Sequence, residues 1–119
     1  MKIAVSSQGK SPDSLMDSRF GRASFFLVFD SGTDTFETLD NEQNLQSTQG
    51  AGIQAASTVV NAGCDCLITG HCGPKAFAAL SKAGVAVYTG CEGSIKDVIE
   101  KFQQGKLTKS VQPDVQGHW

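Results

Sequence analysis

The sequence has no excess of positive charge: 10 lysine and arginine residues stand against 12 aspartate and glutamate residues, giving a net charge of −2. A nucleic-acid-binding face needs clustered basic residues, so this class of function is excluded. No apolar run approaches the ~20 residues that cross a bilayer. The short apolar run at residues 3–5 follows Met1 and Lys2 directly, without the longer apolar core and cleavage site of a signal peptide. We therefore expect a cytoplasmic protein with neither a nucleic-acid nor a membrane partner.

The sequence also lacks the motifs of common enzymes. It contains no Ser–His–acid set, no H-E-x-x-H run and no phosphate-binding G-x-x-x-x-G-K-[S/T] loop. A nuclease would need clustered carboxylates, but Asp30, Asp40 and Asp65 sit at the ends of different predicted strands, and hairpin geometry keeps them apart. These absences predict a protein that is not an enzyme.

The 119 residues suit a single domain. Short apolar or alternating runs predict strands, and apolar residues at helical spacing predict helices. The predicted strands are 3–5, 24–30, 35–39, 66–68 and 85–88, and the predicted helices are 53–62, 74–83 and 95–104. This order predicts an α/β fold: a five-stranded mixed sheet with helices on both faces and the 35–39 strand at its edge. We place the domain at 1–107 and a loosely held polar tail at 108–119.

Two polar segments interrupt this pattern. The loop from Ser6 to Arg22 carries Arg19 and Arg22 close to Phe20. It can be a solvated loop with Phe20 in the core, or an arginine-bearing flap over an anionic ligand. The segment 41–52 has no apolar periodicity and is predicted to be a flexible connection, ending in glycines that precede an anion-attracting helix start.

Two glycine-rich turns, Thr69–Pro74 and Thr89–Gly93, each follow a predicted strand, precede a predicted helix and contain one cysteine. If the strands are parallel neighbours, Cys72 and Cys91 emerge at the same edge of the sheet, where open α/β sheets hold ligands. A helix N-terminus lowers the pKa of a thiol and favours the metal-binding thiolate. His71 is a further candidate ligand, and soft sulfur ligands select copper(I) and iron–sulfur species. The alternative is that both cysteines only pack the turns.

The other two cysteines cannot join them. Cys66 and Cys72 are separated by six residues of extended chain, which spans roughly 20 Å. Thiolates that bind one zinc ion each lie about 2.3 Å from it. A four-cysteine zinc site is therefore excluded, and Cys64 and Cys66 are expected at the opposite end of the sheet, with Cys66 in the core.

Five runs of sequence resemble the dinitrogenase iron–molybdenum cofactor biosynthesis family, whose members have a ribonuclease-H-like fold. They are M-K-I-A-V-S-S at the start, R-F-G-R-A at 19–23, G-A-G-I-Q-A-A at 50–56, G-H-C-G-P-K-A-F-A-A-L at 70–80 and A-G-V-A-V-Y at 83–88. The resemblance extends from Met1 to about Leu107. The sequence also resembles the orange-protein branch of this family, from sulfate-reducing bacteria, which is associated with a molybdenum–copper sulfide cluster.

The resemblance implies a carrier or assembly protein, not an enzyme, for a metal–sulfide cluster of molybdenum–copper or iron–molybdenum type. It also implies cluster donor and recipient proteins as partners, and we expect a monomer. The cluster could be ligated by Cys72, Cys91 and His71. It could instead be held as a bulky anion by backbone amides at Gly73 and Gly93 and by Arg19, Arg22 and Lys75. Two other classes stay open: a thiol redox or zinc-binding module using Cys72, Cys91 and His71, and a regulatory domain without a ligand.

Overall fold

The computed structural model describes residues 1–41 and 50–112. Its helices and strands are β1 (Lys2–Ser7), β2 (Phe25–Asp30), β3 (Thr35–Asp40), α1 (Ala51–Asn61), β4 (Cys66–Ile68), α2 (Pro74–Lys82), β5 (Ala86–Tyr88) and α3 (Ile95–Gln103). Their order is the one that the sequence predicts. The predicted flexible connection at 41–52 falls mostly on residues 42–49, which lie outside the described residues.

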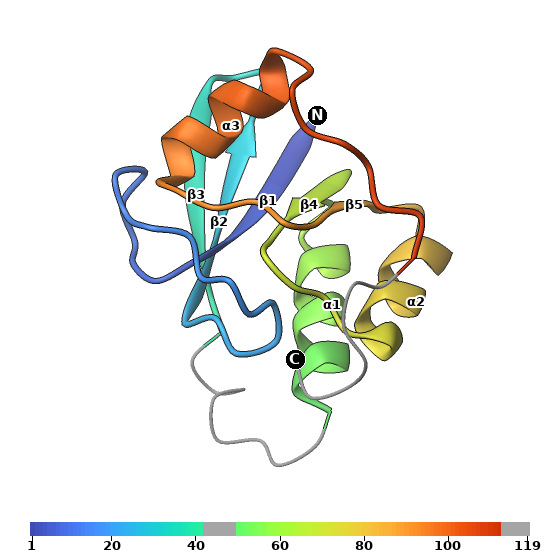
Figure 1. Cartoon of the computed structure of the whole chain (residues 1–119). Coiled ribbons are helices and arrows are strands. Elements are labelled where there is room, and N and C mark those ends of the chain that lie inside the picture. The colour runs from blue at the N-terminus through green and yellow to red at the C-terminus, as the bar shows by residue number, and fades with distance from the viewer. Residues whose placement is uncertain (42–49, 113–119) are drawn as a thin grey trace.

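The strands form one mixed sheet in the order β3-β2-β1-β4-β5. β1 pairs with β2 and β2 with β3 in antiparallel fashion, whereas β1, β4 and β5 run parallel. The largely exposed β3 forms one edge, as predicted. Figure 1 shows α1 and α2 against one face of the sheet and α3 against the other. The predicted α/β architecture is confirmed, and none of the described helices has the length and apolar character to span a bilayer.

Two apolar layers hold the helices to the sheet. Successive residues of a strand point to opposite faces, so a strand covered on both sides is apolar throughout. The layer under α1 and α2 contains Ala4, Phe26, Val28 and Leu67. The layer under α3 contains Ile3, Val5, Leu27, Phe29 and Ile68. This double coverage explains the continuous apolar runs in the sequence.

α2 and α3 begin where the sequence predicts, whereas α1 begins at Ala51, two residues before its predicted start. The Ser94 hydroxyl accepts a hydrogen bond from the amide of Asp97 at 3.3 Å and so caps α3. Gly63 and Gly84 follow α1 and α2 with φ of 77° and 83°. Glycine adopts this left-handed conformation without steric cost, so it ends a helix readily.

The chain after α3 returns to the free edge of β5. The amide of Ser110 donates to the carbonyl of Val87 at 2.7 Å. The Ser110 hydroxyl accepts from the Thr89 amide at 3.1 Å and pairs with the Thr89 hydroxyl at 2.7 Å. The first part of the predicted tail is thus bound to the sheet, whereas residues 113–119 lie outside the described residues.

Candidate functional site

The carboxyl ends of β1, β4 and β5 form a rim that the loop between β1 and β2 crosses (Figure 1). The turns after β4 and β5 are joined, because the amide of Gly90 donates to the carbonyl of Gly70 at 2.8 Å. The loop is tied to both turns by backbone hydrogen bonds: His71 N to Ser18 O (2.7 Å), Phe20 N to His71 O (3.2 Å) and Met16 N to Gly93 O (2.9 Å). The loop is therefore an ordered part of the rim, and Phe20 is buried in the core, as the first of the two alternatives expects.

Gly70 allows the loop to lie this close to the turn after β4. A Cβ atom at this position would lie 2.7 Å from both the Cα and the carbonyl oxygen of Ser18. Only a residue without a side chain fits here while the loop backbone keeps its place.

Buried hydroxyl groups support the loop from below. The Ser6 hydroxyl donates to the carbonyl of Asp17 at 2.7 Å and pairs with the Thr69 hydroxyl at 2.8 Å. The carboxylate of Asp17 accepts from the amide of Arg19 at 2.9 Å and lies 3.6 Å from its guanidinium Nε. These contacts fix the backbone of Arg19 above the carboxyl end of β1.

The two rim cysteines send their sulfur atoms into different layers. Cys72 is 0% exposed and belongs to the apolar layer under α1 and α2. Cys91 is half-buried and packs against the layer under α3. Their turns are neighbours, as predicted, but the side chains are not brought together. Within residues 1–41 and 50–112, no three His, Cys, Asp or Glu side chains form a group that could hold a metal ion, so His71, Cys72 and Cys91 do not converge as a ligand set.

The structure does not support the expectation that Cys91 is a thiolate. Burial raises the pKa of the Cys91 thiol, and the nearby Lys101 offsets this only in part. α3 begins at Ile95, and its N-terminal amide is already capped by Ser94. Cys91 therefore lies ahead of the helix terminus that was expected to lower its pKa.

The remaining predicted residues lie at the start of α2, on the rim loop and in the turn before α3. Gly73 is the buried N-cap residue, Lys75 is exposed in the first turn, and His71 is half-buried and pairs with Arg19 through a backbone bridge. The Arg19 side chain is 49% exposed, and Arg22 is half-buried on the same loop. Gly93, by contrast, belongs to the turn before α3.

The N-termini of α1 and α2 differ from that of α3. Both begin after a glycine, Gly50 and Gly73, which has no side chain to accept from the first-turn amides. Neither helix has an acidic residue in its first turn. α3, by contrast, is capped by Ser94 and has Asp97 in its first turn. Figure 1 shows α1 and α2 starting at the same end of the sheet. Uncapped helix starts attract anions, so this end of the molecule favours a negatively charged ligand.

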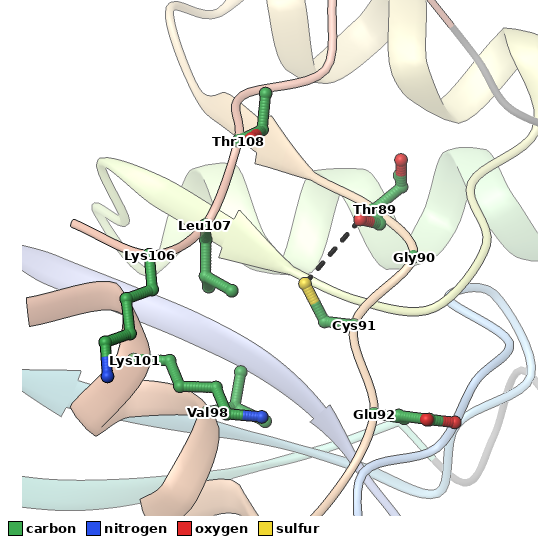
Figure 2. Close-up of a pocket in the computed structure, with 9 residues that line it drawn as sticks. All are labelled: Thr89, Gly90, Cys91, Glu92, Val98, Lys101, Lys106, Leu107 and Thr108. Atoms are coloured by element: carbon green, nitrogen blue, oxygen red, sulfur yellow. Dashed lines mark hydrogen bonds between the residues drawn. The ribbon is translucent and has the colours of Figure 1, made fainter. Parts of the chain in front are cut away.

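The sequence did not predict the pocket that surrounds Cys91. Figure 2 shows this pocket, of about 520 Å³, with Lys101 from α3 and Lys106 and Leu107 from the following segment. Lys106, Leu107 and Thr108 belong to the segment by which the chain returns to β5, and the sequence carries no local signal for that return.

The model of the dinitrogenase iron-molybdenum cofactor family matches residues 1–105. The chain belongs to this family. It is similar to the apo form of the orange protein from Desulfovibrio gigas, with 38% identity, 96% of each chain covered and a TM-score of 0.93. A Thermotoga protein of the DUF35 family is 29% identical, with 98% of each chain covered and a TM-score of 0.84. An uncharacterized protein of Methanocaldococcus jannaschii is 29% identical over 92 residues, which are 76% of this chain and 78% of that protein.

These comparisons confirm the resemblance on which the sequence prediction rests. Membership of the family and the likeness to the orange protein support a general role in binding or assembling a cofactor. The iron–molybdenum cofactor in the family description and the likeness to the orange protein favour a metal–sulfur cluster as the kind of group involved.

Proposed function

We propose that this protein binds a metal–sulfide cluster as cargo and carries or stores it, without catalysing a reaction. A molybdenum–copper sulfide cluster is the proposed composition, and an iron–molybdenum sulfide is the alternative. The likeness to the orange protein over 96% of the chain supports the first, and the family description supports the second. A carrier of this kind would exchange its cargo with donor and recipient proteins.

The proposed mode of binding is non-covalent. A sulfido-bridged cluster is a bulky anion, and its natural partners are cationic side chains and backbone amides. Lys75 supplies a cation in the first turn of α2, Arg19 and Arg22 supply cations on the rim loop, and Gly73 supplies a helix start without a capping side chain. The separation of the Cys72 and Cys91 side chains into opposite layers supports this mode over ligation by both sulfurs.

The observation that carries the proposal is Lys75 in the first turn of α2. A cation at the positive end of a helix opposes the helix dipole, whereas an anion there is stabilised by about 0.3–1 kcal/mol. In the free protein, Lys75 therefore weakens the helix slightly. A bound anion between Lys75 and the helix terminus would reverse the sign of this interaction.

The test is to load the protein with tetrathiomolybdate, with and without copper, and separately with iron and sulfide. Retained metal is measured by elemental analysis, and the cluster by its visible absorbance. The proposal predicts a coloured protein that keeps molybdenum after gel filtration. If no metal is retained and no absorbance develops under any of these conditions, the carrier function is wrong.

Variants separate the two binding modes. Arg19→Gln with Lys75→Gln should weaken loading by about tenfold, since two ionic contacts near the surface together contribute roughly 1.4 kcal/mol. Lys82→Gln with Lys96→Gln removes the same charge elsewhere and should leave loading unchanged. Cys72→Ser, checked for folding by its melting temperature, should still load. Loss of loading in Cys72→Ser alone would instead establish sulfur ligation.

A further inference from the structure

The pocket around Cys91 opens on the α3 side of the sheet (Figure 2). The turn after β5, α3 and the segment that follows α3 each contribute to its wall. Its volume of about 520 Å³ is within the range of small-molecule sites, roughly 300–1,000 Å³. It is therefore large enough to hold an organic ligand beside the cysteine.

The pocket combines a thiol, apolar side chains and cations. Cys91 lines the pocket together with Val98 and Leu107, and its S–H group donates a weak hydrogen bond to the Thr89 carbonyl at 3.6 Å. Lys101 and Lys106 also line this pocket. Among the residues that the structure describes, no ion pair with either lysine is found. Their charges are thus available to a ligand.

Backbone contacts hold these groups in place. The amide of Lys106 donates to the carbonyl of Lys101 at 2.9 Å, which joins the two lysines at the end of α3. Four residues after Lys106, Ser110 is bound to β5 through Val87 and Thr89. The pocket is therefore built by ordered backbone on each side. The carboxylate of Glu92 points away from both lysines in Figure 2.

Cys91 is also the accessible thiol among the four cysteines. Cys64, Cys66 and Cys72 are 7%, 4% and 0% exposed, whereas Cys91 is half-buried and faces the pocket. A ligand in the pocket would lie beside this sulfur and the side chains of Lys101 and Lys106. We propose that the pocket binds small disulfides that carry carboxylate groups, and that Cys91 exchanges with them to form a mixed disulfide. This activity goes beyond cluster binding.

The exchange is balanced within the two reactants. The Cys91 thiolate attacks one sulfur of the bound disulfide, the ligand's sulfur–sulfur bond breaks, and a new bond forms between Cys91 Sγ and that sulfur. The other half of the ligand leaves with the electron pair as a thiolate and takes a proton from water. Cys91 is oxidised from thiol to disulfide, and the leaving half is reduced to a thiol. The carboxylate on the half that stays attached is then within the pocket that holds Lys101 and Lys106.

The test compares two disulfide probes of different charge. 5,5′-Dithiobis(2-nitrobenzoate) carries two carboxylates, and 4,4′-dithiodipyridine is neutral. The rate constant for each is measured on the full chain at one pH, so that their ratio does not depend on the fraction of thiolate. Replacing both pocket lysines with glutamine should lower this ratio by about tenfold, because both favourable charge interactions are lost. Raising salt from about 0.01 M to about 1 M should lower it in the wild type as well.

Lys82→Gln with Lys96→Gln is the matched control. It removes the same charge as the pocket variant, and Lys96 lies on α3 as Lys101 does. This variant should keep the wild-type ratio. Peptide mapping by mass spectrometry should find the label on Cys91, and Cys91→Ser should abolish the fast reaction. The proposal is overturned if another cysteine is labelled first. It is also overturned if the ratio of the two rate constants is unchanged in the Lys101 and Lys106 variant, or if this ratio falls equally in the control variant.

Discussion

Replacing Gly70 with alanine is expected to displace the loop that crosses the rim. The new Cβ would lie 2.7 Å from the Cα and carbonyl oxygen of Ser18 and 2.9 Å from its Cβ. Carbon atoms in contact are normally about 3.5–4.0 Å apart, so the two backbones must separate by roughly 1 Å. This movement stretches the hydrogen bonds His71 N to Ser18 O (2.7 Å) and Phe20 N to His71 O (3.2 Å).

The expected cost follows from these contacts. Overpacking in a closely packed region costs about 1–3 kcal/mol. Each backbone hydrogen bond that is lost adds about 0.5–1.5 kcal/mol. With both hydrogen bonds lost, the sum is roughly 2–6 kcal/mol, which for a domain of this size lowers the melting temperature by roughly 10–25 °C. Thermal unfolding followed by circular dichroism measures this change, and amide exchange of residues 18–20 should become faster.

Two further variants make the prediction specific. Gly63→Ala is the control, because Gly63 has a φ of 77° and nothing lies within 4 Å of an added Cβ. It should cost only about 1–2 kcal/mol of backbone strain and leave the rim loop protected from exchange. Ser18→Gly removes the nearby Cβ but not the Cα or carbonyl, so it should not restore Gly70→Ala. The close approach is refuted if Gly70→Ala melts within a few degrees of the wild type, or if Ser18→Gly restores it.

Three other changes are predicted. Ser94→Ala removes the α3 cap and should lower the free energy of unfolding by about 1 kcal/mol, measured by urea denaturation. Ser6→Ala leaves the buried Thr69 hydroxyl with one partner fewer and should cost about 1–3 kcal/mol in the same assay, whereas alanine at exposed Ser31 should cost much less. Burial raises the pKa of Cys64 from 9.0 to about 11, so its neutral thiol stabilises the fold below pH 9.0 and this contribution is lost as the pH rises towards 11. Between those pH values, the free energy of unfolding should therefore fall less in Cys64→Ala than in the wild type. An equal fall would show that the buried Cys64 thiol is not the cause.

The sequence alone determined the elements of this fold, because the signals for them are local. The apolar run ending at Asp30 indicates a covered strand. Ser94 is a residue type that favours the start of a helix, and it caps α3. The edge position of β3 also followed from its polar, alternating residues. The position of the two cysteine turns at one end of the sheet was likewise predictable, because parallel strands end at the same edge.

Only the tertiary structure decided where the side chains at that edge point. Beyond the end of a strand, side-chain direction depends on the path of the turn and on residues far away in the sequence. Cys72 therefore enters the layer under α1 and α2, and Cys91 enters the layer under α3. The same holds for the raised pKa of Cys91, since desolvation is the sum of packing by the whole chain. Leu107 and Thr108 line the pocket in the segment that returns to β5 at Ser110, and no local pattern encodes that contact.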